Sequence, residues 1–155
     1  MAELKTAFVG KSPRIAIEYM GAGPLLVFLH GVGGNRTNWR EQLPVFADHF
    51  TTVAWDARGW GDSEDYDGPY QFSDVVEDLM GVYEFFGVEK AVLVGLSMGG
   101  RICLETWKRR PEKIRALVLA DTSAGMHDKI SPEKMAEQMR MRREPLMKEN
   151  GARLM

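Results

Sequence analysis

The chain has 155 residues, of which 45% are apolar and 27% charged, a composition typical of one soluble globular domain. A formal net charge of −2 gives no electrostatic reason to expect nucleic acid or an anionic membrane as a partner. No segment reaches the length of a membrane span, no signal-peptide pattern is present, and the single cysteine, Cys103, cannot form an internal disulfide. A cytoplasmic location is therefore expected.

Three segments at the start of the chain have strand character. The composition of residues 4–9 favours a β-strand. In residues 14–19, apolar and polar positions alternate from Ile15 and Ile17 onward, and this second segment is predicted to be a half-buried edge strand. After a Gly-Pro turn, residues 25–29 are all apolar, as is typical of a strand buried on both faces of a parallel sheet. A mostly parallel sheet is therefore expected from this point.

A glycine-rich loop, residues 30–35, follows this strand at the carboxyl edge of the sheet, where ligands bind in open α/β sheets. A phosphate-binding loop is excluded, because G-x-G-x-x-G requires glycine where Arg36 stands and no Walker lysine is present. His30, at the end of a buried strand, is interpreted as a structural histidine whose ring holds the loop. The loop is therefore expected to direct backbone N–H groups at a substrate.

Two helices are predicted next. The first begins at Thr37, and Pro44 should bend it or divide it into two pieces. The second covers residues 73–86, with Ser73 as N-cap and Gly87 as C-cap. The residues expected to face the sheet are Trp39, Leu43, Phe46 and Phe50 in the first helix and Val76, Leu79, Met80, Tyr83 and Phe86 in the second, with Asp74, Glu77, Asp78 and Glu84 facing outward.

Between these helices, residues 51–55 form a strand that leads into a loop carrying Asp56 and Arg58. Asp56 could be a catalytic acid. A carboxylate two residues from an arginine more often forms a buried structural pair or braces backbone N–H groups, and this structural interpretation is preferred.

Residues 91–94 form another fully apolar strand, and the next residues, 95–99, match the pattern G-x-S-x-G. A helical pattern begins at Gly100, so strand, sharp turn and helix follow in the order that the motif requires. In such an elbow the serine, here Ser97, is strained, and the two glycines leave room where strand and helix pass closely. Ser97 is the candidate nucleophile, and the alternative is that it only caps the helix. The residues expected on the inward face of that helix are Ile102, Cys103, Thr106 and Trp107.

Two backbone N–H groups are candidates to stabilise negative charge on a substrate oxygen. Met98 directly follows the serine at the start of the new helix, where the helix dipole favours an anion. A second donor is expected in the glycine-rich loop, from Val32 or, as second choice, Gly33.

Beyond the elbow helix, residues 114–120 are predicted to form a further strand. Ser131 and Pro132 then begin a helix that is expected to run to about Arg143. Six of the ten methionines lie at position 126 or later, which suits an adaptable apolar surface or plain core filling.

Three motifs in this order and spacing resemble the α/β-hydrolase superfamily: His-Gly-x-Gly-Gly after one strand, Asp-x-Arg-Gly-x-Gly-Asp-Ser after the next and Gly-x-Ser-Met-Gly-Gly at the elbow. The resemblance covers residues 12–125. With Leu-Ala-Asp-Thr at residues 119–122, it is closest to the esterase and lactonase branch that includes 3-oxoadipate enol-lactonases and cofactor-free haloperoxidases.

The resemblance implies a serine hydrolase that needs no cofactor or metal. Ser97 would attack an ester or lactone carbonyl, and the N–H groups of Val32 and Met98 would hold the oxyanion. A serine at the elbow argues against the haloalkane dehalogenase and epoxide hydrolase branches, whose nucleophile is a carboxylate.

The resemblance also implies an acid and then a histidine after the nucleophile, with the histidine after the last strand. His127 follows the wrong strand, and Asp121 is at a strand end that only a minority of the superfamily uses for its acid. Residues 1–125 are therefore expected to be the amino-terminal part of a hydrolase core and 126–155 the start of a helical cap. The acid and histidine are expected beyond the last residue, from a carboxyl-terminal segment or a second chain, without which the last predicted strand would be an open edge.

Two other functions stay open. One is the hydrolysis of carbon–carbon bonds in ring-cleavage products, which uses the same triad. The other is a non-catalytic ligand-binding or partner-binding module, because no suitable histidine is visible. The cap largely sets the substrate preference, so the identity of the substrate is not indicated.

Overall fold

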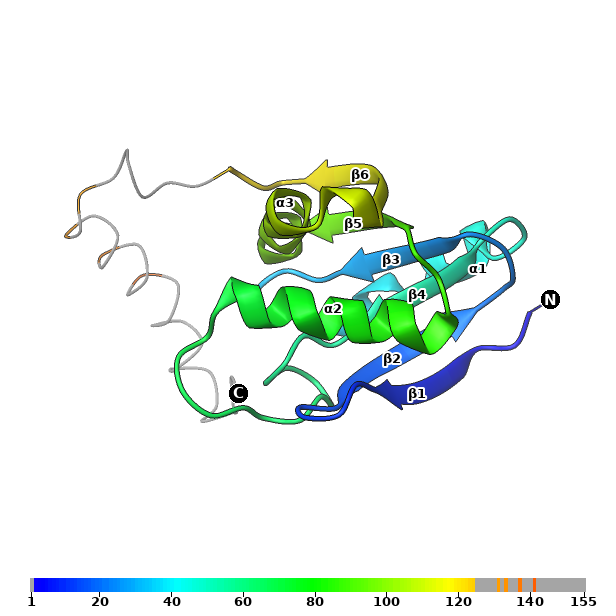
Figure 1. Ribbon diagram of the computed structural model, residues 1–155, viewed down its shortest axis with the longest axis horizontal. Coiled ribbons are helices and arrows are strands. Elements are labelled where there is room, and N and C mark those ends of the chain that lie inside the picture. The colour runs from blue at the N-terminus through cyan, green and yellow to red at the C-terminus, as the bar shows by residue number, and fades with distance from the viewer. Residues whose placement is uncertain (1, 125–130, 132, 134–136, 138–140, 142–155) are drawn as a thin grey trace.

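The structure, a computed structural model, describes residues 2–124 and the single positions 131, 133, 137 and 141 (Figure 1). The predicted cap segment, residues 126–155, lies outside the described residues apart from these four positions, and so does His127. In the described part of the chain, no helix is long and apolar enough to cross a membrane.

A six-stranded sheet forms the centre of the described part, with the strand order β1-β2-β4-β3-β5-β6 (Figure 1). β1 pairs with β2 and β2 with β4 in antiparallel register, whereas β4, β3, β5 and β6 run parallel to one another. The predicted α/β fold with a mostly parallel sheet is confirmed. The strands are β1 (Lys5–Val9), β2 (Ile15–Met20), β3 (Leu25–Leu29), β4 (Thr51–Trp55), β5 (Ala91–Leu96) and β6 (Ile114–Ala120).

Helices cover both faces of the sheet (Figure 1). One buried cluster, which includes Trp55, joins the sheet to α2 and α3, and a smaller one, which includes Phe28, joins its other face to α1. Successive strand residues alternate between the two clusters, which explains why the central strands are apolar throughout. The helical elements are η1 (Arg36–Trp39), α1 (Gln42–Phe46), α2 (Phe72–Phe86), α3 (Met98–Arg109) and η2 (Pro111–Lys113).

β2 is not the half-buried edge strand that its alternating pattern predicts. It lies between β1 and β4, and Ala16 and Glu18 are buried. The Glu18 carboxylate accepts two hydrogen bonds from the Arg40 guanidinium, at 2.6 and 2.9 Å. These bonds hold the pKa of Glu18 below its usual range. The acid in the alternating pattern, Glu18, is therefore buried and does not face solvent. Its partner, Arg40, is distant in the sequence.

The predicted helix from Thr37 is divided into two pieces, η1 and α1, as expected. The division precedes Pro44, which lies in the first turn of α1, where its missing N–H is not needed. α2 ends at Phe86, and Gly87 has the left-handed φ of 63° expected of a C-cap.

The predicted N-cap of α2 is wrong, because Gln71 and not Ser73 precedes the first helical residue. The helix begins at Phe72, whose ring packs edge-to-face on Tyr70 and lies 5.0 Å below the Arg101 guanidinium. The helix therefore starts two residues earlier than an N-cap at Ser73 indicates, and these contacts hold its first residue. The Ser73 hydroxyl instead donates to the Asp74 carboxylate at 3.2 Å.

α3 buries Ile102, Cys103 and Thr106 as predicted, but the inward position predicted for Trp107 is wrong. Trp107 lies at the edge of the buried face of α3 and is 58% exposed. Within the described part of the chain, β6 pairs only with β5, so the predicted open edge is present.

Candidate active site

Ser97 lies at the sharp turn between β5 and α3, with φ 52° and ψ −108°. A positive φ is uncommon for a residue with a side chain, and the surrounding structure must hold it in place. Two contacts with the end of β6 do so. The Ser97 N–H donates to the carbonyl oxygen of Ala120 at 2.9 Å, and the Thr122 hydroxyl donates to the carbonyl oxygen of Ser97 at 2.8 Å. The predicted strained elbow is therefore present.

Glycine is required on both sides of Ser97, because backbone segments pass too closely for a side chain. A Cβ on Gly95 would lie 2.4 Å from the carbonyl oxygen of Gly99. A Cβ on Gly99 would lie 2.1 Å from the carbonyl oxygen of Leu29 in β3. The second contact shows that the start of α3 is pressed against the end of β3, where the glycine-rich loop begins.

The glycine-rich loop after β3 lies against the candidate nucleophile. A Cβ on Gly31 would come within 3.2 Å of the Ser97 Cβ. The loop turns back through a hydrogen bond from the Gly34 N–H to the Gly31 carbonyl oxygen, at 3.0 Å. Gly31 has no role among the sequence-based predictions, although its place directly after His30 is part of the motif that carries the resemblance.

The two predicted oxyanion donors lie next to these contact points. Val32 follows Gly31, and Met98 follows Ser97 as the first residue of the 12-residue helix α3. Neither N–H has a hydrogen-bond partner among the described residues. Both N–H groups are therefore unpaired within the described part of the chain, and that of Met98 lies at the positive end of a helix.

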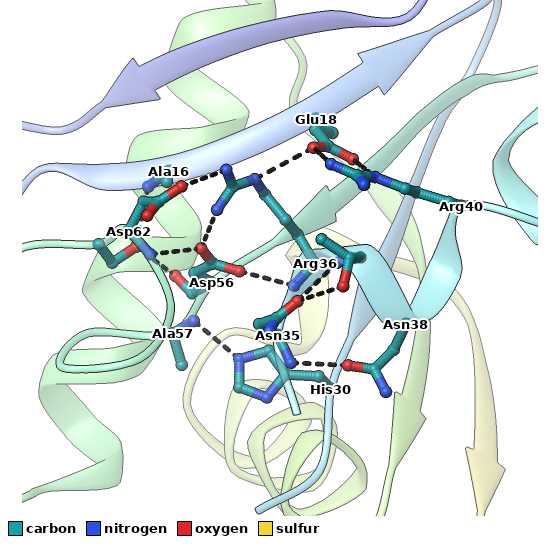
Figure 2. A network of polar contacts seen from close by, with 12 residues as sticks. Ala16, Glu18, His30, Asn35, Arg36, Asn38, Arg40, Asp56, Ala57 and Asp62 are labelled. Carbon is teal, nitrogen blue, oxygen red and sulfur yellow. Dashed lines mark hydrogen bonds and ion pairs between the residues drawn. The ribbon is translucent and has the colours of Figure 1, made fainter. Parts of the chain in front are cut away.

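The His30 ring is buried, and both of its nitrogens are engaged. Nδ1 donates to the carbonyl oxygen of Gly31 at 2.8 Å. Nε2 accepts the Ala57 N–H at 3.0 Å, as Figure 2 shows. This pattern requires the neutral ring with its proton on Nδ1. Burial lowers the pKa of His30, which favours the same form. The ring has no nitrogen free to take a proton from Ser97, in agreement with the structural interpretation.

The Asp56 carboxylate is buried and braces two loops, as Figure 2 shows. It accepts the backbone N–H of Arg36 at 2.6 Å and that of Asp62 at 2.8 Å, and it also pairs with the Arg36 guanidinium. The predicted bracing role is present, but the predicted partner, Arg58, is wrong. The actual partner comes from the start of η1.

Arg58 pairs with α2 instead. Its guanidinium donates to both carboxylate oxygens of Asp78, at 2.6 and 2.8 Å, and faces Asp74 at 3.4 Å. Arg58 and Asp78 are both only 9% exposed, so the outward orientation predicted for Asp78 is also wrong. An ion pair across 20 residues of sequence overrides the helical pattern.

No histidine reaches Ser97 among the residues that the structure describes. His30 is engaged at both nitrogens, and the His49 backbone packs against Gly23, near the opposite end of the parallel strands. His127 lies outside the described residues. Within the same described part, no group of three or more His, Cys, Asp or Glu side chains could hold a metal ion.

A family model described as the alpha/beta hydrolase fold matches residues 24–149. A 2-hydroxymuconate semialdehyde hydrolase of Pseudomonas sp. (strain CF600) is 36% identical over 128 residues, which cover 80% of this chain and 45% of that protein. A 3-oxoadipate enol-lactonase of Acinetobacter baylyi is 28% identical over 114 residues, which cover 71% of this chain and 43% of that protein.

Among solved structures, a hydrolase from Pseudomonas aeruginosa PA01 matches with a TM-score of 0.77 and 31% identity, over 93% of this chain and 53% of that one. The chain therefore spans less than half the length of the two curated relatives and about half of the solved structure. The predicted resemblance is confirmed, and the chain belongs to the α/β-hydrolase family.

Proposed function

We propose that this chain carries the nucleophile of a serine hydrolase that acts on a carboxylic ester or a lactone. The observation that carries the proposal is Ser97 itself, held at φ 52° between two loops with unpaired backbone N–H groups beside it. The similarity to a 3-oxoadipate enol-lactonase supports an ester or lactone as the substrate class.

In the proposed reaction, the Ser97 oxygen bonds to the carbonyl carbon of the substrate while its proton passes to a base. The N–H groups of Val32 and Met98 stabilise the negative charge that develops on the carbonyl oxygen. The bond to the alcohol then breaks, the alcohol leaves with the proton, and the acyl group stays on Ser97. Water, deprotonated by the same base, attacks the acyl carbon, and the Ser97 oxygen leaves and regains its proton.

We propose further that the base and its acid come from a carboxyl-terminal segment or a second chain. Two observations on the described residues support this: no histidine reaches Ser97, and β6 has an unpaired edge with Val118 and Leu119 50% and 42% exposed. Intact mass spectrometry of an active preparation tests it. A single species with the mass of the 155-residue chain and full hydrolase activity would overturn the proposal of a partner.

The reaction is tested by offering a panel of substrates to the protein at its native length. p-Nitrophenyl esters and enol-lactones should be hydrolysed, and Ser97→Ala should lower kcat by at least about 1000-fold. Ser73→Ala, a serine substitution in the first turn of α2, is the matched control and should leave kcat unchanged. Inertness towards every ester and lactone would count against the proposal.

A second candidate is the hydrolysis of a carbon–carbon bond in a ring-cleavage product, favoured by the similarity to the 2-hydroxymuconate semialdehyde hydrolase. Dienoic ring-cleavage products in the same panel separate the two reactions. If Ser97 is unreactive at native length while small molecules still bind, the non-catalytic binding module becomes the better account.

A further inference from the structure

A cavity of about 300 Å³ lies where the loop after β4 meets the elbow. Its size is at the lower end of the range for ligand pockets. Met98 connects it to the candidate active site, because this residue lines the cavity and also carries a proposed oxyanion donor. The other lining residues are Arg58, Gly59, Trp60, Asp65, Tyr66 and Tyr70.

Aromatic rings dominate this wall and are held in place by one another. The Tyr66 and Tyr70 rings meet edge-to-face with their centroids 5.7 Å apart. The Trp60 ring packs in the same manner on the buried His30 ring, at 5.8 Å. Rigid aromatic walls of this kind contact a planar apolar group with little loss of side-chain freedom.

The charges around the cavity are unfavourable for an anionic group. The Arg58 guanidinium is bound by Asp78 and faces Asp74, and Asp65 adds another carboxylate to the lining. One guanidinium thus stands among three carboxylates, so an entering carboxylate meets net repulsion. The Arg58 guanidinium already lies over the Tyr66 ring, 5.6 Å from its centroid, so this ring face is not open to a second cation.

We propose that this cavity is the subsite for one substituent of the scissile carbonyl and that it takes an uncharged aromatic group. Its role as a substrate subsite rests on the proposed hydrolase function, since it is Met98 that joins the cavity to the reacting serine. The substrate class is thereby narrowed to esters or lactones with a neutral aromatic substituent, in preference to those with a carboxylate at that position.

Binding of two probes of nearly equal shape, phenylacetamide and phenylacetate, tests the subsite without any hydrolysis. The dissociation constants are measured on the purified chain by ligand-observed NMR. Phenylacetamide should bind about tenfold more tightly than phenylacetate at low salt. Asp65→Asn should reduce this preference by about threefold, whereas the matched Asp67→Asn, two residues further along the chain and not in the lining, should leave it unchanged.

A second pair of variants tests the aromatic wall. Trp60→Leu should weaken phenylacetamide binding by about fivefold. The control, Trp107→Leu, replaces an exposed tryptophan of α3 that does not line the cavity and should have no effect. Tyr66→Leu should weaken binding similarly, which separates loss of the wall from any effect of Trp60 on folding.

Equal binding of the two probes, or equal losses in Trp60→Leu and Trp107→Leu, would overturn the subsite. A different result would overturn the proposed hydrolase function. If phenylacetamide binds with the expected pattern but Ser97 shows no reactivity at native length, the cavity remains a binding site for neutral aromatic groups and the hydrolase proposal falls.

Discussion

The Nε2 atom of His30 accepts a hydrogen bond from the Ala57 N–H at 3.0 Å, and this contact ties the loop after β3 to the loop after β4 (Figure 2). Both loops leave the carboxyl edge of the sheet, and the first of them also touches Ser97 through Gly31. The neutral His30 ring is therefore part of the framework that places the candidate oxyanion donor Val32.

Protonation of His30 should destabilise the fold as the pH falls. Burial lowers the pKa of the folded ring below its ordinary value of 6.5, so the unfolded chain binds more protons in this range. The free energy of unfolding should be constant above about pH 7 and decrease as the pH falls through about 6.5 towards the lowered pKa. Urea unfolding at a series of pH values between 8 and 5 measures this slope.

Two histidine variants show which group causes the pH dependence of the free energy of unfolding. His49→Gln should keep the pH dependence, whereas His30→Asn should be less stable at pH 8 and should lose the slope between pH 6.5 and 5. An unchanged slope in His30→Asn would show that another group is responsible.

Gly99→Ala should destabilise the chain by about 3 kcal/mol or prevent folding, because the added Cβ would meet the Leu29 carbonyl oxygen at 2.1 Å. Gly81→Ala is the matched control in α2. The nearest atom to its added Cβ is 3.5 Å away, and alanine is the better helix former, so this variant should be about 0.5–1 kcal/mol more stable. Chemical denaturation of both variants checks the pair, and similar effects of the two substitutions would contradict the close approach at the elbow.

Asp78→Asn should destabilise the chain by about 3 kcal/mol, because it leaves the nearly buried Arg58 guanidinium without its bidentate partner. Glu105→Gln breaks a pair with Arg109 on the partly exposed surface of α3 and should change the unfolding free energy by less than about 0.5 kcal/mol. Thermal and urea unfolding distinguish the two. A loss in Asp78→Asn no larger than that in Glu105→Gln would show that the Arg58 pair does not stabilise the fold.

The elbow could be predicted from sequence because its signals are local. The glycines that allow the close approaches lie within two residues of Ser97, and the apolar strand directly precedes it. The same holds for the C-cap at Gly87. In each case, the residues that determine the backbone are neighbours along the chain.

The ion pairs could not be predicted in this way. Arg36 binds Asp56 and Arg58 binds Asp78, each across 20 residues, and Arg40 binds Glu18 across 22. Helical or strand periodicity places charged residues at the surface by default, and only the fold determines which of them have a buried partner. The aromatic cavity was missed for a related reason, because Trp60 and Tyr66 lie in a loop that has no periodic pattern.

The most direct test of the central claim is the reaction of the protein, at native length, with a fluorophosphonate probe, followed by peptide mass spectrometry. The account predicts one covalent adduct, on the peptide that contains Ser97, and no adduct in Ser97→Ala. Failure of Ser97 to react, or labelling of other serines such as Ser63 or Ser73 to the same extent, would contradict the assignment of Ser97 as the nucleophile.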